Sequence, residues 1–266
     1  MIVFTLHHCR PQNDSLVVTP RLLERAILAI RGLGFEFISY GDFRKGLAGE
    51  FKLRRNHVLL TFDDGYWDNY AFAYPVLKKH GVPAVIFLVA GSILDAAREG
   101  EPAPKPQKQI DAARDTDLFL RVSEAREMGQ SGLIEFDSHT FSHFDCDSED
   151  EAALKNEFAK SFERMKELFP KRDSYGFCWP RGHFNALSLK TLKECGYNFA
   201  FSTIDGPFCA GDDPYIIRRV DISTAKKGER DYLARIRKKL LVYSAPFFGD
   251  WYSRFGSRNS KYRLPK

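Results

Sequence analysis

The stretch His57-Val58-Leu59-Leu60-Thr61-Phe62-Asp63-Asp64-Gly65 joins a short apolar run to two adjacent carboxylates and a glycine. The apolar run predicts a buried strand, in which neighbouring side chains point to opposite faces. At a strand end, beside a glycine that can adopt positive φ, both carboxylates can turn into one cleft. One could then hold a cation while the other handles a proton. The alternative is an ordinary polar turn, because Asp-Gly is common in turns.

Length and composition set the class of protein. The chain has 266 residues, 44% of them hydrophobic, a length that is normal for an α/β barrel. No stretch approaches the roughly 18–20 apolar residues of a membrane span. The start, Met1–Phe4, lacks the basic region and cleavage site of a signal peptide. Five scattered cysteines without CxxC spacing favour reduced thiols, so we expect a cytoplasmic protein.

Strands and helices are predicted to alternate along the chain, which indicates a parallel α/β barrel or barrel-like sheet with its function at the carboxyl ends of the strands. A proline-containing insertion or mobile loop interrupts the pattern near residues 91–117, and residues 13–18 are predicted to be loop. Strands are predicted at 2–6, 35–38, 57–60, 82–89, 133–136, 175–178, 197–202 and 215–222. Helices are predicted from Pro20 to Ile30 and at 69–80, 123–128, 148–168, 187–195 and 231–243.

Polar side chains follow most of the predicted strands, and in a parallel barrel these strand ends converge on one face. His139 and His143 lie four residues apart, so one helical turn or a tight loop could bring both imidazoles to one ion. The alternative is that both histidines are ordinary surface residues that bind no ion. With a carboxylate from the Asp63-Asp64 pair, two imidazoles form an open site suited to a divalent transition metal.

At this point the chain resembles the polysaccharide deacetylases (the NodB-homology domain, carbohydrate esterase family 4). Thr61–Gly65 and His139–His143 are similar to the first two motifs of that family in order and separation, and Phe177–Gly182 falls where the third belongs. The resemblance covers roughly residues 1–222. It implies a distorted (β/α) barrel domain over 1–222. We expect residues 223–266 to form a basic helical and aromatic extension that packs on the barrel or on a membrane surface.

The resemblance also implies roles for individual residues. Asp64, His139 and His143 match the metal ligands, usually for zinc. Asp63 matches the general base that takes a proton from the attacking water, and such a carboxylate beside a metal suits that task. The oxyanion of the reaction would need a further donor, which in the family is a backbone N–H that falls here at Arg181.

The chain departs from the family pattern in two places. Cys178 occupies the position at which many members carry an arginine that orients the base. No histidine follows His183, so the usual C-terminal catalytic acid is absent. Some relatives take the acid from an aromatic-His pair after the first strand, and on that basis we predict His7 as the acid, with His8 as the alternative.

Further candidate site residues lie in the C-terminal part of the predicted barrel. Arg219 matches an arginine of some relatives and could orient Asp63, bind substrate or make an ordinary surface pair. Trp179, Pro180 and Arg181 are the candidate substrate-binding residues. The Trp179 ring, like that of Phe184, either stacks on a sugar or packs in the core.

The net charge of +5 is concentrated in the C-terminal segment, where residues 226–266 hold twelve Lys and Arg against three Asp and Glu. This excess predicts an anionic partner. The helix predicted at 231–243 is amphipathic and basic, and it either lies on an anionic membrane face or packs on the barrel. The aromatic segment 247–252 is compatible with either a membrane interface or packing on the barrel. No nucleic-acid motif accompanies the charge, so we expect no nucleic-acid partner.

The leading hypothesis is a metal-dependent hydrolase that removes an acyl group, most simply acetyl, from an amino sugar. The substrate would be an amino sugar, a nucleotide sugar or a lipid-linked oligosaccharide of surface-polysaccharide or glycolipid biosynthesis, met in the cytoplasm or at the inner membrane face. One alternative is a non-catalytic carbohydrate-binding protein on the same fold. Another is hydrolysis of a different non-peptide C–N bond, such as a formamide.

Overall fold

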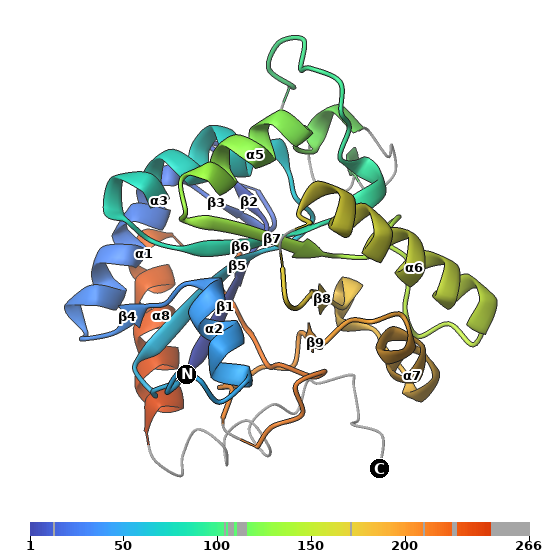
Figure 1. The fold of residues 1–266 in the computed structure, drawn as a ribbon. Coiled ribbons are helices and arrows are strands. Elements are labelled where there is room, and N and C mark those ends of the chain that lie inside the picture. Colours follow the sequence, from blue (N-terminus) through green and yellow to red (C-terminus); the bar gives the residue numbers. More distant parts are fainter. Residues whose placement is uncertain are drawn as a thin grey trace.

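A curled parallel sheet forms the centre of the molecule, and helices surround it (Figure 1). In the described part of the chain the strand order is β10-β1-β5-β6-β7-β8-β9, with β4 also paired to β5. The strands are β1 (Ile2–Leu6), β4 (Glu36–Phe37), β5 (His57–Phe62), β6 (Ala84–Leu88), β7 (Ile134–Ser138), β8 (Gly176–Cys178), β9 (Phe199–Phe201) and β10 (Val220–Asp221). A separate parallel pair joins β2 (His8–Cys9) to β3 (Val17–Val18).

The helices mostly occupy the predicted positions. They are α1 (Pro20–Gly32), α2 (Tyr40–Leu47), α3 (Tyr74–His80), α5 (Val122–Gln130), α6 (Glu151–Leu168), α7 (Ala186–Glu194) and α8 (Glu229–Ser244). A π-helical turn over Asn69–Ala73 leads directly into α3. This computed structural model describes residues 1–12, 14–103, 105, 109–110, 116–170, 172–209, 211–224 and 228–245.

The segment after β9 joins the two edges of the sheet. Ile217 bridges Phe201 of β9, and Val220 then pairs with Phe4 of β1. The strand predicted at 215–222 is therefore real but interrupted, because its first half follows β9 and its second half follows β1. This change of partner curls the sheet into the distorted (β/α) barrel and places Arg219 between the two pairings.

Alternation along the strands separates two apolar layers. Outward side chains such as Phe4 and Leu60 pack under the surrounding helices. Inward side chains such as Val3, Leu59 and Phe87 form an aromatic-rich cluster inside the barrel. Helix α2 closes the amino end of this interior, since Tyr40 and Phe43 are buried in the same cluster.

Several local predictions were wrong in detail. Residues 17–18 form β3 rather than loop, because His8 and Arg10 donate backbone N–H bonds to Leu16 and Val18. Helix α2 was not anticipated. Helix α5 begins at Val122, so Ser123, which we expected to cap this helix, lies inside its first turn. The Glu124 carboxylate instead accepts the N–H of the N-cap residue Arg121 at 2.8 Å. Parts of the insertion at 91–117 and all of 247–252 lie outside the described residues.

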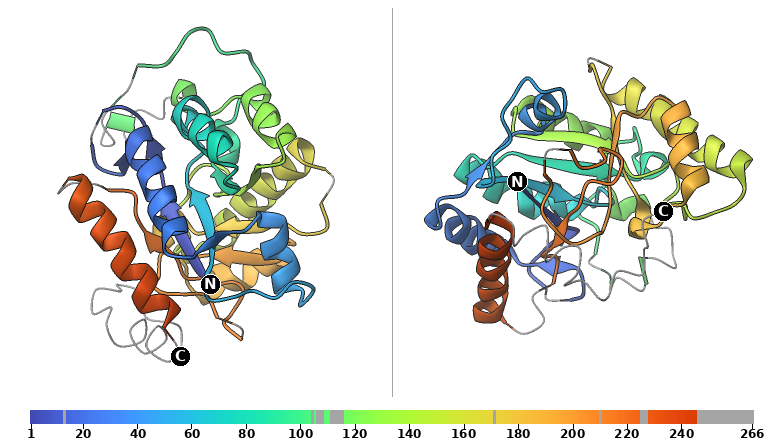
Figure 2. Two further views of the ribbon diagram at one scale, coloured as in Figure 1. Left: turned by 90° about the vertical axis from the view of Figure 1, so that its left-hand side faces the viewer. Right: turned by 90° about the horizontal axis from the view of Figure 1, so that it is seen from below.

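Helix α8 lies beside α1 on one side of the barrel (Figures 1 and 2). Ile236 and Leu240 are fully buried there, whereas Leu241 is 59% exposed. The basic side chains Arg237 and Lys238 face solvent. None of the described helices is long and apolar enough to cross a bilayer. The division of the chain at residue 222 stays a prediction.

Two substitutions on α8 test this packing. Ile236→Ala should lower the free energy of unfolding by about 2–5 kcal/mol, because it opens a cavity under the helix. Leu241→Ala on the exposed side should change it by no more than about 0.5 kcal/mol. Urea denaturation measures both, and equally small effects would mean that α8 is not packed on the barrel.

Candidate metal centre and active site

The carboxyl end of β5 separates the two adjacent aspartates. Asp63 continues the inward alternation of Leu59 and Thr61, so its carboxylate lies inside the barrel mouth. Asp64 adopts φ 73°, a left-handed conformation that is uncommon outside glycine, and Gly65 follows with φ 75°. This change of backbone direction lets both buried carboxylates reach one cleft, so the predicted Asp-Asp arrangement is present.

Asp64, His139 and His143 come together as one donor set. Asp64 Oδ1 lies 3.5 Å from His139 Nε2 and 3.4 Å from His143 Nε2. Three ligands at about 2.0–2.1 Å from a tetrahedral ion stand about 3.3–3.4 Å apart. The donor atoms all lie within 4.8 Å of one another. The set therefore fits a divalent transition metal and leaves coordination positions open on the cavity side.

The two histidines come from a loop, not a helix. His139 follows β7, and the chain then takes positive φ at Thr140 (66°) and again at His143 (60°). Each such residue costs roughly 1–3 kcal/mol and persists only where its surroundings hold it. Ala90 and Gly91 help to stabilise this loop conformation, because their N–H groups donate to the carbonyls of Thr140 and Phe141.

The hydrogen bond made by Nδ1 of His139 leaves Nε2 of the same ring free to bind a metal. Nδ1 lies 2.8 Å from the Cys178 carbonyl oxygen, which can only accept a hydrogen bond, so Nδ1 carries the proton and Nε2 has the lone pair. Burial lowers the pKa of His139 to about 4, although the nearby Asp63 acts in the opposite direction. The ring is therefore neutral near pH 7.

A second donor group, Asp63, His139 and Cys178, overlaps with the first. Two features argue against it as the metal centre. Burial raises the pKa of the Cys178 thiol well above its usual value, which favours the neutral thiol over the metal-binding thiolate. Both oxygens of Asp63 are also held by Arg219. Cys178 instead packs with its Sγ 3.7 Å from Asp63 Oδ1.

Arg219 forms a bidentate ion pair with Asp63. Its Nη1 and Nη2 donate to Oδ1 and Oδ2 at 2.6 and 2.8 Å, and Nε donates to the Ser202 carbonyl oxygen at 2.8 Å. Arg219 is 2% exposed, which excludes an ordinary surface pair. Burial would raise the pKa of Asp63, but the Arg219 guanidinium, together with the imidazoles of His139 and His7, holds it well below the usual range. Arg219, in the segment just before β10, thus orients Asp63 from a different part of the chain than β8, which carries Cys178.

His7 and His8 lie in different environments. His7 lines the cavity, with Nε2 3.9 Å from Asp63 Oδ2 and Nδ1 2.9 Å from Ser223 Oγ. His8 is buried, stacked on Tyr66 and held by Asp68, with 2.5 Å between Nδ1 and Oδ2. The geometry favours His7 as the residue that reaches a substrate. Ser223 was missed in the sequence because nothing local marks its contact with His7.

The cavity at this end of the barrel has a volume of about 460 Å³, a size typical of small-ligand sites. Besides Asp63, Asp64 and the histidines, its lining includes Arg181, with φ 55°, and Thr203 on the facing segment. Aromatic side chains Tyr66, Phe119 and Phe141 form an apolar wall.

Trp179 and Pro180 do not line the cavity. The Trp179 ring is fully buried against Phe158 and Phe177, and its Nε1 donates to the Tyr215 carbonyl oxygen at 3.0 Å. Stacking of Trp179 on a sugar is therefore corrected to core packing, and Pro180 is buried beside it. Of the three candidate substrate-binding residues, Arg181 alone lies at the cavity.

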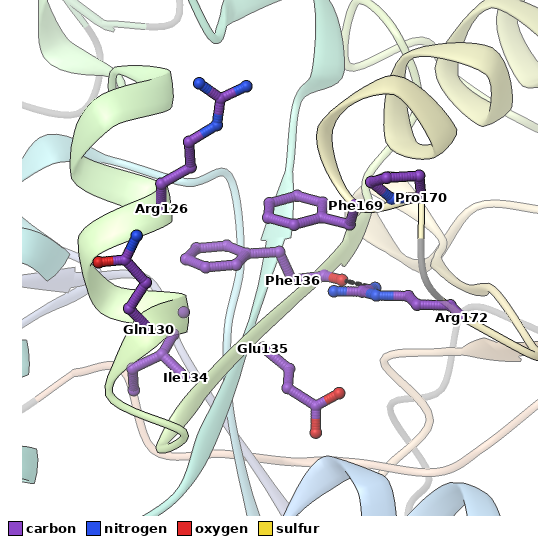
Figure 3. A pocket seen from close by; sticks show the side chains of 9 residues that line it. Arg126, Gln130, Ile134, Glu135, Phe136, Phe169, Pro170 and Arg172 are labelled. Carbon is purple, nitrogen blue, oxygen red and sulfur yellow. Dashed lines mark hydrogen bonds between the residues drawn. The ribbon is translucent and has the colours of Figure 1, made fainter.

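A second cavity of about 470 Å³ lies at the amino end of β7, between α5 and the chain after α6 (Figure 3). Phe136 and Phe169 stack there with their ring centroids 5.1 Å apart. The Arg172 guanidinium lies 4.8 Å from the Phe169 centroid and donates to the Phe136 carbonyl oxygen. This cavity lies at the opposite end of β7 from His139, and none of the predicted site residues lines it.

Comparison with known proteins places this chain among the carbohydrate deacetylases. The chain belongs to the polysaccharide deacetylase family, whose sequence model matches residues 52–200. It is 27% identical over 223 residues to YxkH of Bacillus subtilis, covering 84% of this chain and 72% of that protein.

A second relative is the poly-β-1,6-N-acetyl-D-glucosamine N-deacetylase of Escherichia coli K12, 29% identical over 203 residues. The match covers 66% of this chain but only 29% of that longer protein. Among solved structures, the deacetylase PplD of Streptococcus pyogenes has a TM-score of 0.72 at 21% identity, covering 92% of this chain and 98% of its own. IcaB from Ammonifex degensii has a TM-score of 0.70 at 23% identity, covering 89% and 96%. These two structures show the same fold.

The Asp63–Arg219 pair gives a direct stability test. Arg219→Met should lower the free energy of unfolding by about 3–5 kcal/mol, because it leaves a buried carboxylate without its counter-ion. The double variant Asp63→Asn/Arg219→Met should recover much of that loss in urea denaturation. If Arg219→Met were as stable as the parent protein, Asp63 would not depend on this guanidinium.

Proposed function

We propose that the protein is a metal-dependent N-deacetylase that removes an acetyl group from an amino sugar used in surface-polysaccharide or glycolipid biosynthesis. The observation that carries the proposal is the shared cavity. It joins the donor set Asp64, His139 and His143 to an ionised carboxylate, Asp63, that Arg219 orients. Membership in the polysaccharide deacetylase family supports hydrolysis of an N-acyl sugar.

The three ligands would hold a divalent ion, most simply zinc. Such an ion polarises an amide carbonyl and lowers the pKa of water toward ~7. Asp63 is ionised at neutral pH, since its pKa lies below the usual range, and this carboxylate would accept the proton from water. Each carboxylate oxygen has two lone pairs. Oδ1 accepts from both Arg219 and the Cys178 thiol, so the lone pair that remains for water is on Oδ2, which accepts only from Arg219 among these groups.

His7 would complete the proton transfer. Water adds to the acyl carbon and gives a proton to Asp63, the C–N bond breaks, and the amine leaves with a proton from His7 Nε2. Products are acetate and a free amino sugar. The 3.9 Å between His7 Nε2 and Asp63 Oδ2 lets the acid and the base face the same scissile amide. Arg181 lines the same cavity, and we propose that its backbone N–H assists the oxyanion.

Substitutions in the donor set separate metal binding from proton transfer. Asp64→Asn and His139→Ala should lose both bound metal and turnover. Asp63→Asn should keep its metal but lose about 10²–10⁴-fold in turnover, as expected for a general base. Elemental analysis of the purified protein and acetate release from a panel of N-acetylamino sugars measure the two effects. Activity that survived both Asp64→Asn and His139→Ala would overturn the metal assignment.

The two adjacent histidines form a matched pair. His7→Ala should lower kcat by about 10²–10⁴-fold while the metal content stays unchanged, because it removes only the proton donor. His8→Ala should mainly lower the melting temperature, because His8 contacts Asp68 and Tyr66 rather than the cavity. Full activity in His7→Ala would exclude His7 as the acid.

The cytoplasmic location stays a prediction, and we propose contact of α8 with the anionic inner membrane face. Support comes from the solvent-facing Arg237 and Lys238. Because Ile236 and Leu240 are buried against the outside of the barrel, this contact would be electrostatic rather than insertive. Binding to vesicles containing phosphatidylglycerol should be lost in about 0.5 M salt and in Arg237→Glu/Lys238→Glu. Equal binding to neutral phosphatidylcholine vesicles would contradict the proposal.

A further inference from the structure

The loop that carries the two histidine ligands is fixed by a carboxylate from another element. Glu157 lies on α6 and is 8% exposed. Its Oε2 accepts the backbone N–H groups of Phe141 at 3.2 Å and Ser142 at 2.9 Å. Its Oε1 accepts the Ser142 hydroxyl at 2.9 Å. All three bonds go to residues that stand between His139 and His143 in the chain.

These bonds act where the loop is most strained. The loop has positive φ at Thr140 and His143, on either side of the two residues that Glu157 binds. Hydrogen bonds to an ionised carboxylate are stronger than neutral ones, and they compete directly with relaxation of such a backbone. Neighbours Leu154 and Phe158 are fully buried, so α6 holds the carboxylate in a fixed place.

We propose that Glu157 is a positioning residue of the metal centre, holding the loop in the conformation that directs His139 and His143 toward Asp64. This inference rests on the proposed metal site. Without these bonds the loop would have to be ordered when the ion binds, so the ion would bind more weakly. Partners that orient metal ligands typically contribute 10–100-fold to metal affinity.

The test is the affinity of the purified protein for Zn²⁺ alone, measured by competition with a chromophoric chelator. Glu157→Ala should weaken binding by about 10–100-fold. Glu157→Gln should stay within about threefold of the parent protein, because the amide oxygen can accept both N–H groups and the Ser142 hydroxyl can reorient to accept from the amide. Glu163→Ala removes an exposed glutamate from the same helix and should leave the affinity unchanged.

A shorter carboxylate covers the case in which Glu157→Ala does not fold. Glu157→Asp keeps the charge but withdraws it by about 1.5 Å, and it should also weaken Zn²⁺ binding. Parental affinity in a folded Glu157→Ala or Glu157→Asp protein, with only a lower melting temperature, would overturn the inference. If the parent protein itself bound no Zn²⁺, the proposed metal-dependent function would fail instead.

Discussion

The buried ion pair between Asp63 and Arg219 is the interaction on which the barrel mouth depends. It links the end of β5 to the segment that changes partner from β9 to β1, so the same contact closes the sheet and orients the carboxylate. Burying either charge without the other would strongly destabilise the folded protein. The pairing makes an ionised carboxylate stable in a buried position beside a metal-binding set.

Unusual backbone conformations surround the same cavity. Among the described residues, the non-glycine positions with positive φ are Leu16, Asp64, Thr140, His143 and Arg181, and all but Thr140 line the cavity. Such conformations are retained only where neighbouring contacts enforce them. In the loop after β7, the N–H groups of Ala90 and Gly91 supply such contacts from one side, and Glu157 of α6 supplies them from the other. The site is therefore built by distant elements acting on short loops.

The sequence predicted the parts of this structure that local pattern determines. Apolar runs located the inner strands, and the motifs containing Asp64 and His139 located the donor set. The long-range contacts were not predictable in this way, since Glu157 looks like any polar residue of an amphipathic helix and Ser223 like a loop serine. Burial of Trp179 was equally hidden, because an aromatic side chain suits both a core and a sugar platform.

X-ray absorption spectroscopy of the zinc-loaded protein tests the central claim most directly, because His139 belongs to two overlapping donor groups. If Asp64, His139 and His143 hold the ion, the spectrum will show two imidazoles and oxygen ligands at about 2.0–2.2 Å and no sulfur. A sulfur ligand at about 2.3 Å would place the ion on Cys178 and contradict the assignment of Asp63 as the base.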